Sequence, residues 1–141
     1  MISKLILLLS LPVVSCTAIR AQEIKYNCVY RTYCEENVFS GRLDNCDGYD
    51  EDSYFMLSDG GKEIIHFTQD LTSIYSVHNT KYYPGTRTLS LRVTSDAGND
   101  YEYVIDEAHK KIKVYFLNHE SEGLVAIFTI GTINEKNEAY E

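Results

Sequence analysis

The sequence of 141 residues contains no tryptophan, only two prolines and few basic residues. Its 13 Lys and Arg residues stand against 21 Asp and Glu residues, which gives a formal net charge of −8 at pH 7. An acidic chain is repelled by phosphate backbones and by anionic lipid surfaces, so nucleic acid is not an expected partner. The missing tryptophan also weakens any expectation of stacking on sugars.

The sequence also lacks the short motifs that mark common metal and catalytic sites. Its histidines, His66, His78, His109 and His119, are scattered, and no HxH, HExxH or CxxC spacing occurs. No metal site is therefore expected. The patterns G-x-S-x-G and S-x-x-K and a glycine-rich phosphate loop are absent as well, so no catalytic residue and no cofactor is predicted.

Acidic residues are plentiful in the segment 35–52, which holds seven carboxylates and, as its only base, Arg42. Clustered carboxylates can bind calcium, but this segment lacks the alternating ligand positions and the distal glutamate of an EF-hand. The segment is therefore expected to be a solvated acidic loop.

The longest apolar run lies near the start of the chain. Leu5–Val14 follows the positive Lys4 and is apolar apart from one serine and one proline. That length suits the apolar region of a secretory signal peptide and is too short to span a bilayer. We expect a signal peptide over residues 1–21, cut after Ala21, and a secreted or periplasmic mature chain without a transmembrane helix. The net charge of this mature chain would be −10, from 11 basic and 21 acidic residues.

A second processing site competes with the cut after Ala21. The run Val13-Val14-Ser15-Cys16 resembles the lipobox of bacterial lipoproteins, in which a small residue precedes a cysteine. The resemblance implies cleavage before Cys16 and a lipid on its thiol, which would anchor the protein to the cell envelope. Cleavage after Ala21 is favoured, and neither route leaves Cys16 for a disulfide.

From residue 23 onward, β-rich runs alternate with turn residues, and no convincing helical period appears. Leu89, Leu91 and Val93 share one face of such a run, and Asp59-Gly60-Gly61 suits a tight hairpin turn. Strands are predicted at Ile24–Tyr33, Ser53–Ser58, Lys62–Thr68, Thr72–His78, Thr86–Thr94, Tyr101–Asp106, Lys111–Leu117 and Leu124–Ile133.

Sequential strands with short links pair antiparallel as a meander. About eight strands over residues 22–133 predict an all-β single domain, either a small up-and-down barrel or a curved sandwich. A helix over residues 69–76 is an alternative for the fourth run. Residues 134–141 are predicted to form a polar, frayed tail.

The mature chain keeps three cysteines, Cys28, Cys34 and Cys46. Cys28 and Cys34 would lie about 20 Å apart on an extended strand, at roughly 3.3 Å per residue, which is beyond disulfide reach. Cys34–Cys46 is the favoured pair in an oxidising compartment, with Cys28–Cys46 and a fully reduced chain as alternatives. Cys28 shares strand parity with Tyr26 and Tyr30, so we expect a buried free thiol, with a reactive or intermolecular cysteine as the alternative.

The twelve tyrosines are the most suggestive feature for binding. Tyrosine combines an apolar ring with a polar hydroxyl, which suits a ligand surface, although it is also a common strand residue. If the barrel closes, an apolar ligand could enter its mouth. The candidate ligand-binding residues are Tyr101, Tyr103, Tyr115 and Phe128.

These patterns favour an exported, non-enzymatic β-domain that binds a small ligand or an envelope protein. One alternative is a small secreted hydrolase that uses an unrecognised pair of acids or a cysteine. Another is a lipid-anchored structural or inhibitory envelope protein that acts through its acidic disulfide loop.

Overall fold

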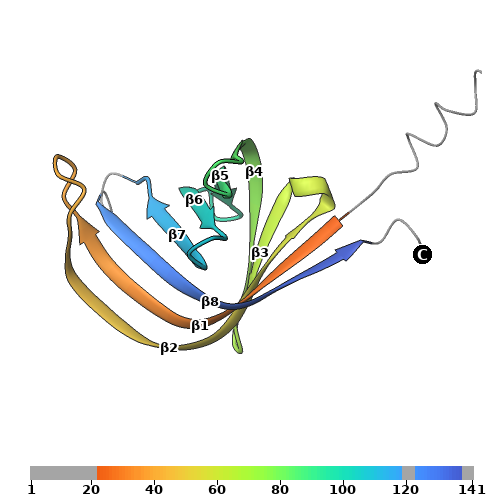
Figure 1. The fold of residues 1–141 in the computed structure, drawn as a ribbon, viewed down its shortest axis with the longest axis horizontal. Helices are drawn as coiled ribbons and strands as arrows, with labels where there is room; N and C mark the ends of the chain where they lie inside the picture. The colour runs from red at the N-terminus through yellow and green to blue at the C-terminus, as the bar shows by residue number, and fades with distance from the viewer. Residues whose placement is uncertain (1–21, 119–122, 138–141) are drawn as a thin grey trace, which may run out of the picture.

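The computed structural model describes residues 22–118 and 123–137, and these form an all-β meander (Figure 1). Each strand pairs antiparallel with the next along the chain, and β1 also pairs with β8, which closes the sheet into a barrel. The strands are β1 (Gln22–Glu36), β2 (Leu43–Ser58), β3 (Glu63–Phe67), β4 (Thr72–Tyr83), β5 (Thr88–Ser95), β6 (Asp100–Asp106), β7 (Lys111–Phe116) and β8 (Leu124–Asn137). The predicted fold class is therefore confirmed as a closed barrel, and the predicted signal peptide, Cys16 and His119 lie outside the described residues.

Alternation of side chains along the shorter strands fills the barrel. On β3, β5, β6 and β7, two buried residues lie two positions apart and the residue between them is more exposed. The largest fully buried side chains are Tyr26, Tyr103, Phe55, Ile64, Leu91, Ile105, Ile112, Val93 and Val125. The interior is thus a packed apolar core over much of the barrel.

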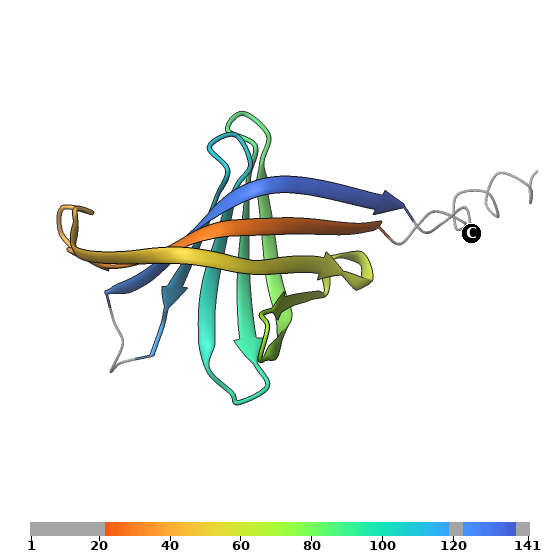
Figure 2. The same ribbon diagram turned by 90° about the horizontal axis from the view of Figure 1, so that it is seen from below.

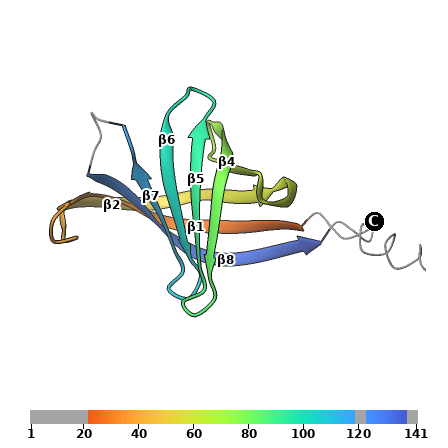
Figure 3. The ribbon, with the colours of Figure 1, turned by 90° about the horizontal axis from the view of Figure 1, so that it is seen from above.

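Four strands, β1, β2, β4 and β8, are several residues longer than the sequence pattern predicted. The long strands β8, β1 and β2 run side by side, and β4, β5 and β6 cross them steeply (Figures 2 and 3). β2 takes in residues 43–52, so the prediction of a solvated loop is wrong for that part of the acidic segment. Its backbone pairs with β1, and such pairing does not require apolar side chains.

Other polar segments also form strand ends that the sequence pattern did not predict. β8 continues through residues 134–137, where it pairs with the start of β1, although these residues were predicted as a frayed tail. β4 continues to Tyr83, and the alternative helix over residues 69–76 is not formed. Asp59–Gly61 forms a short 3₁₀ turn between β2 and β3, so the connection is longer than a tight hairpin turn.

The two ends of the barrel differ. At the end where β1 begins and β8 finishes, Tyr26 is fully buried and its hydroxyl donates a hydrogen bond to Glu107 (3.4 Å) in the β6–β7 turn. The turn between β1 and β2 lies at the opposite end, together with the connections β3–β4, β5–β6 and β7–β8. The candidate site lies at this second end.

Within residues 22–118 and 123–137, no helix has the length and apolar character needed to cross a membrane.

Candidate functional site

A bulge in β1 decides which of its side chains enter the barrel. The pairing of β1 shifts between Cys28 and Tyr30 against both β2 and β8. Cys28 points into the core, whereas Val29 and Tyr30 both lie outside, so the predicted shared parity of Cys28 and Tyr30 is wrong. Beyond the bulge, Arg31 and Tyr33 line the barrel interior. An extra residue in a strand re-aims the side chains that follow it, and here it brings a charge inside.

Strand β8 adapts to this bulge at Gly131. A Cβ atom at Gly131 would lie only 2.9 Å from Cγ1 of Val29, closer than side chains normally approach. Glycine therefore lets β8 follow the bulged part of β1 at close range.

The charge of Arg31 is balanced by Glu51 of β2. Both Nε and Nη2 of Arg31 donate hydrogen bonds to Oε2 of Glu51, and the two side chains are only 15% and 8% exposed. Nη1 of Arg31 donates to the hydroxyl of Tyr33 (2.8 Å). A buried ion pair needs such additional hydrogen bonds to offset the loss of water from both charges.

Ser53 and His66 complete the polar cluster. The hydroxyl of Ser53 donates to Oε2 of Glu51 (2.7 Å), and Nε2 of His66 lies 3.1 Å from Oγ of Ser53. Because the proton of Ser53 is directed to Glu51, His66 donates from Nε2 to the serine oxygen. We call Arg31, Glu51, Ser53 and His66 the interior polar cluster.

Burial sets the protonation of His66. Its imidazole stacks on Phe55, with 4.0 Å between ring centroids, and is largely removed from water. Desolvation, assisted by the charge of Arg31, lowers the pKa of His66 to about 4 against the opposing effect of Glu51. The imidazole is therefore neutral at pH 7.

Cys28 is a buried free thiol, as predicted. Burial and the nearby carboxylate of Glu51 raise its pKa to about 12. A protonated, enclosed thiol is a poor nucleophile.

A cavity of about 120 Å³ opens beside the interior polar cluster. Six aromatic side chains form most of its wall: Phe55, Tyr75, Tyr101, Tyr103, Phe116 and Phe128. Arg31, Tyr33 and His66 add further polar groups, and Val114 and Ala126 are its small aliphatic members. The cavity thus combines an aromatic wall, which carries three tyrosine hydroxyls, with a polar corner at Arg31, Tyr33 and His66. Aromatic side chains with a few polar groups are typical of small-molecule sites.

Ring contacts hold this wall in place. Tyr101 packs edge-on against Tyr75 and Phe116, with centroid distances of 5.6 and 5.3 Å. The guanidinium of Arg31 lies over the ring of Phe128, 4.5 Å from its centroid. Burial and a hydrogen bond with Tyr75 raise the pKa of Tyr103 well above its ordinary value, so its hydroxyl stays protonated.

Three of the four predicted ligand-binding residues lie together. Tyr101, Tyr103 and Phe128 all line the interior cavity. Tyr115 is not among them and instead lines an outer hollow of about 400 Å³ with Val104 and Leu117. Residues of β7 alternate between the two faces, and Phe116, near the end of the strand, borders both the interior cavity and the outer hollow.

The predicted disulfide Cys34–Cys46 is present, with 4.2 Å between the two Cα atoms. It joins β1 to β2 beside a second shift in their pairing, between Tyr33 and Glu35. The disulfide therefore fixes the end of β1 just after Arg31 and Tyr33.

No metal site emerges from the part of the chain that the structure describes. Nowhere in 22–118 or 123–137 do three His, Cys, Asp or Glu side chains gather closely enough to hold an ion.

The sequence did not identify the interior polar cluster. Glu51 belongs to the acidic segment that was predicted as a loop, and His66 is one of the scattered histidines that matched no site motif. Strand alternation could have identified it, because Glu51, Ser53 and Phe55 occupy every second position of one strand and point inward together. Comparisons with protein family models, curated proteins and solved structures gave no match to this chain.

Proposed function

We propose that the protein is a non-enzymatic binding protein that takes a small, mainly apolar ligand into the open end of its barrel. The observation that carries this proposal is the aromatic cavity beside a buried, paired arginine. Most eight-stranded barrels fill their interior with side chains or leave room for one small ligand. Here the core is filled at one end and leaves about 120 Å³ at the other.

The volume of the interior cavity limits the size of the ligand. Drug-sized ligands occupy pockets of roughly 300–1,000 Å³, whereas a cavity of about 150 Å³ takes a molecule of the size of benzene. A space of about 120 Å³ therefore suits a single ring or a short alkyl group. A longer ligand would place one end inside and leave the rest at the mouth.

The polar corner suggests what the inner end of the ligand carries. Arg31 has five N–H donors, of which three are directed to Glu51 and Tyr33. An acceptor oxygen on the ligand would use the remaining donors. Because Glu51 already balances the charge of Arg31, a neutral acceptor serves as well as a carboxylate.

The chemistry of the cluster favours binding over hydrolysis. Ser53, His66 and Glu51 are neighbours, but both Ser53 and Glu51 approach Nε2 of His66, at 3.1 and 3.8 Å. In a catalytic triad the acid holds the other ring nitrogen. A histidine with a pKa of about 4 is also a weak base at neutral pH.

A titration with defined probes tests the proposal. Amide shifts of ¹⁵N-labelled protein would be followed during addition of benzoate and of toluene, which lacks the acceptor. We expect saturable shifts along β1, β6 and β8, with tighter binding of benzoate. Ala126→Leu, which fills the cavity, should weaken binding at least about tenfold, as expected when an occupied pocket is closed by side-chain bulk.

A control variant for Ala126→Leu changes a residue on the other face of the sheet. Val104→Leu adds bulk in the outer hollow and should leave benzoate binding unchanged. Equal loss in both variants, or shifts that fail to saturate with either probe, would contradict the proposal.

Binding of an envelope protein is the second candidate function. Phe39, in the β1–β2 turn, is 96% exposed, and the nearby outer hollow is lined by Val38, Leu117 and Leu124. Large exposed apolar groups next to a hollow are typical of interaction surfaces. Phe39→Ser should abolish binding of a purified partner while leaving benzoate binding intact.

We also infer that the protein works outside the cytoplasm. The Cys34–Cys46 disulfide supports this location, since such bonds persist in oxidising compartments. The mass of the natural protein tests it: a chain that begins at Gln22 indicates secretion, and an acylated Cys16 indicates a lipid anchor. A chain of unprocessed mass with reduced cysteines would contradict export.

A further inference from the structure

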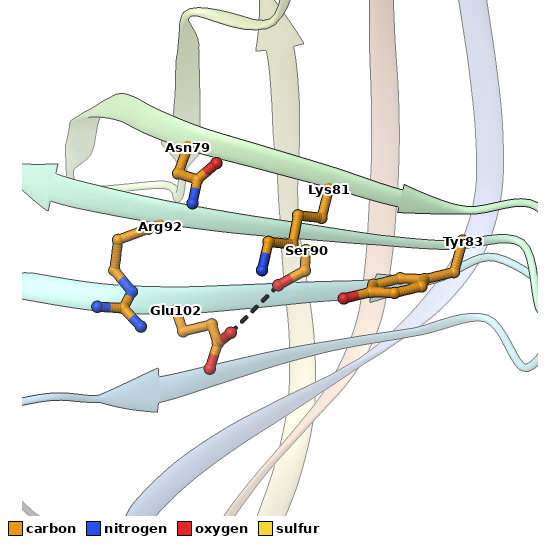
Figure 4. Close-up of a pocket in the computed structure, with 6 residues that line it drawn as sticks. All are labelled: Asn79, Lys81, Tyr83, Ser90, Arg92 and Glu102. Atoms are coloured by element: carbon orange, nitrogen blue, oxygen red, sulfur yellow. Dashed lines mark hydrogen bonds between the residues drawn. The ribbon is translucent and has the colours of Figure 1, made fainter.

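The outer face of β4, β5 and β6 holds a polar hollow of about 220 Å³ (Figure 4). Six residues line it: Asn79, Lys81, Tyr83, Ser90, Arg92 and Glu102. We propose that this hollow binds a sugar that carries a carboxylate, such as a uronic acid. The site is separate from the interior cavity, and the two have no lining residue in common.

A bulge in β4 builds the hollow. The pairing of β4 with β5 shifts between Val77 and Asn79. Before the shift Val77 packs against the core, whereas after it Asn79, Lys81 and Tyr83 line the outer hollow. The change in parity therefore places three consecutive odd-numbered side chains on one outer surface.

The pairing of the strands places these side chains in adjacent rows. Asn79 lies opposite Arg92, which lies opposite Glu102 on β6, and Lys81 lies opposite Ser90. Side chains on one face of neighbouring strands are within contact distance when they are directly opposite. The ring of Tyr83 stands at one end of the group and the guanidinium of Arg92 at the other, with Lys81 and Ser90 between them (Figure 4).

The charge of the hollow is opposite to that of the protein. Lys81 and Arg92 outweigh Glu102, although the chain as a whole has a net charge of −8. Neither Lys81 nor Arg92 forms an ion pair with any residue in the ranges 22–118 and 123–137. Two exposed cations that lie diagonally across β4 and β5 favour an anionic ligand.

Glu102 limits the kind of anion that the hollow can bind. Its carboxylate accepts a hydrogen bond from the hydroxyl of Ser90 (3.1 Å), which fixes it inside the hollow. A carboxylate there opposes a phosphate group, which has a higher charge and no donor in its ionised form. The hydroxyl groups of a sugar can instead donate to Glu102, while a sugar carboxylate meets Lys81 and Arg92.

The remaining side chains fit the same ligand. The ring of Tyr83 is half exposed and can pack against the apolar face of a sugar ring. The amide of Asn79 offers both a donor and an acceptor for hydroxyl groups. The volume of about 220 Å³ suits one monosaccharide unit, at the end of a chain or free.

The experiment uses glucuronate as the probe and follows amide shifts of the folded domain at low salt. We expect saturable shifts in β4, β5 and β6, and weaker binding as salt is raised. Glucose, which lacks the carboxylate, and inorganic phosphate, which lacks the sugar hydroxyls, should each bind at least about tenfold more weakly. Glucose binding equal to that of glucuronate, or phosphate binding equal to it, would overturn the proposal.

Exposed variants test the individual groups without disturbing the core. Arg92→Gln and Tyr83→Ala should each weaken glucuronate binding about tenfold. Lys62→Gln removes a cation from the β2–β3 turn, outside the hollow, and should leave binding unchanged. Equal weakening by Lys62→Gln would mean that net charge alone attracts the probe, and this would overturn the site.

Discussion

At the scale of single residues, stability depends on Glu51 more than its place in an acidic segment suggests. Glu51→Gln would leave the guanidinium of Arg31 buried without its counter-charge. We expect the free energy of unfolding, measured in urea, to fall by about 3 kcal/mol, as when one partner of a buried ion pair is removed. The double variant Arg31→Met, Glu51→Leu should recover most of this loss, because it removes both charges together.

The exposed pair Arg42–Asp44 provides the control for that measurement. Its side chains are 77% and 45% exposed, so Asp44→Asn should cost less than about 1 kcal/mol. A loss for Glu51→Gln as small as that for Asp44→Asn would contradict the description of the interior polar cluster.

His66 should make stability depend on pH. Its pKa is about 4 in the folded protein and 6.5 ordinarily, so between these values the unfolded chain binds a proton that the folded chain excludes. The contribution of neutral His66 to the free energy of unfolding is complete above about pH 6.5. It is lost as the pH falls toward 4, and the total loss is about 3 kcal/mol.

Urea unfolding at several pH values checks this expectation. His66→Gln should flatten the dependence between pH 6.5 and 4, and His78→Gln, which changes an exposed histidine, should leave it in place. An unchanged slope in His66→Gln would contradict a neutral, buried imidazole.

Part of the candidate site could be predicted residue by residue. Tyr101, Tyr103 and Phe128 lie in strands whose apolar pattern is clear, and all three line the cavity. Arg31 could not be assigned to the interior, because the bulge at Val29 reverses the parity that places Cys28 inside. A bulge depends on the pairing with two neighbouring strands, and a single strand does not encode it.

At the scale of strands, the close approach of β1 and β8 needs glycine at one position. Gly131→Ala should lower the free energy of unfolding by about 1–2 kcal/mol, since its Cβ would collide with Val29. Adding Val29→Ala should recover part of the loss by making room. Gly85→Ala, in a turn where an added Cβ meets nothing within 4 Å, is the control and should be nearly neutral.

The disulfide should stabilise the β1–β2 hairpin. Replacing both Cys34 and Cys46 by serine should cost about 3 kcal/mol in urea unfolding, on the chain-entropy estimate for a loop of this length, because the two residues are 12 positions apart. A chain that begins at Gln22 should also resist thiol labelling in its native form, since Cys28 is enclosed, and should take up one label per chain on unfolding. Rapid labelling of the native form would contradict the enclosed thiol.

The order of the strands could be read from the sequence, but some of their ends could not. Predicted runs such as Tyr101–Asp106 coincide with the observed strand because apolar alternation and flanking turns agree. The first half of β2 is acidic and mostly exposed, and it is a strand because its backbone pairs with β1. Backbone pairing of this kind does not require a particular side-chain composition, so the sequence pattern does not predict it.

At the scale of the whole molecule, closure of the barrel separates the two proposed sites. Closure depends on pairs such as Asn27 and Thr132, which are 105 positions apart and joined by a side-chain hydrogen bond. The sequence left a barrel and a sandwich as alternatives because local patterns do not specify such distant pairs. With the barrel closed, an inner aromatic cavity and an outer cationic hollow belong to opposite faces of one sheet.

Intermolecular NOEs from bound 4-methylbenzoate would show directly whether the interior cavity receives a ligand. In methyl-labelled protein, we expect NOEs from the probe to Ala126 and Val114, which line the cavity. NOEs only to Val104 and Leu117, which line the outer hollow, would contradict it, as would the absence of any NOE at saturating probe.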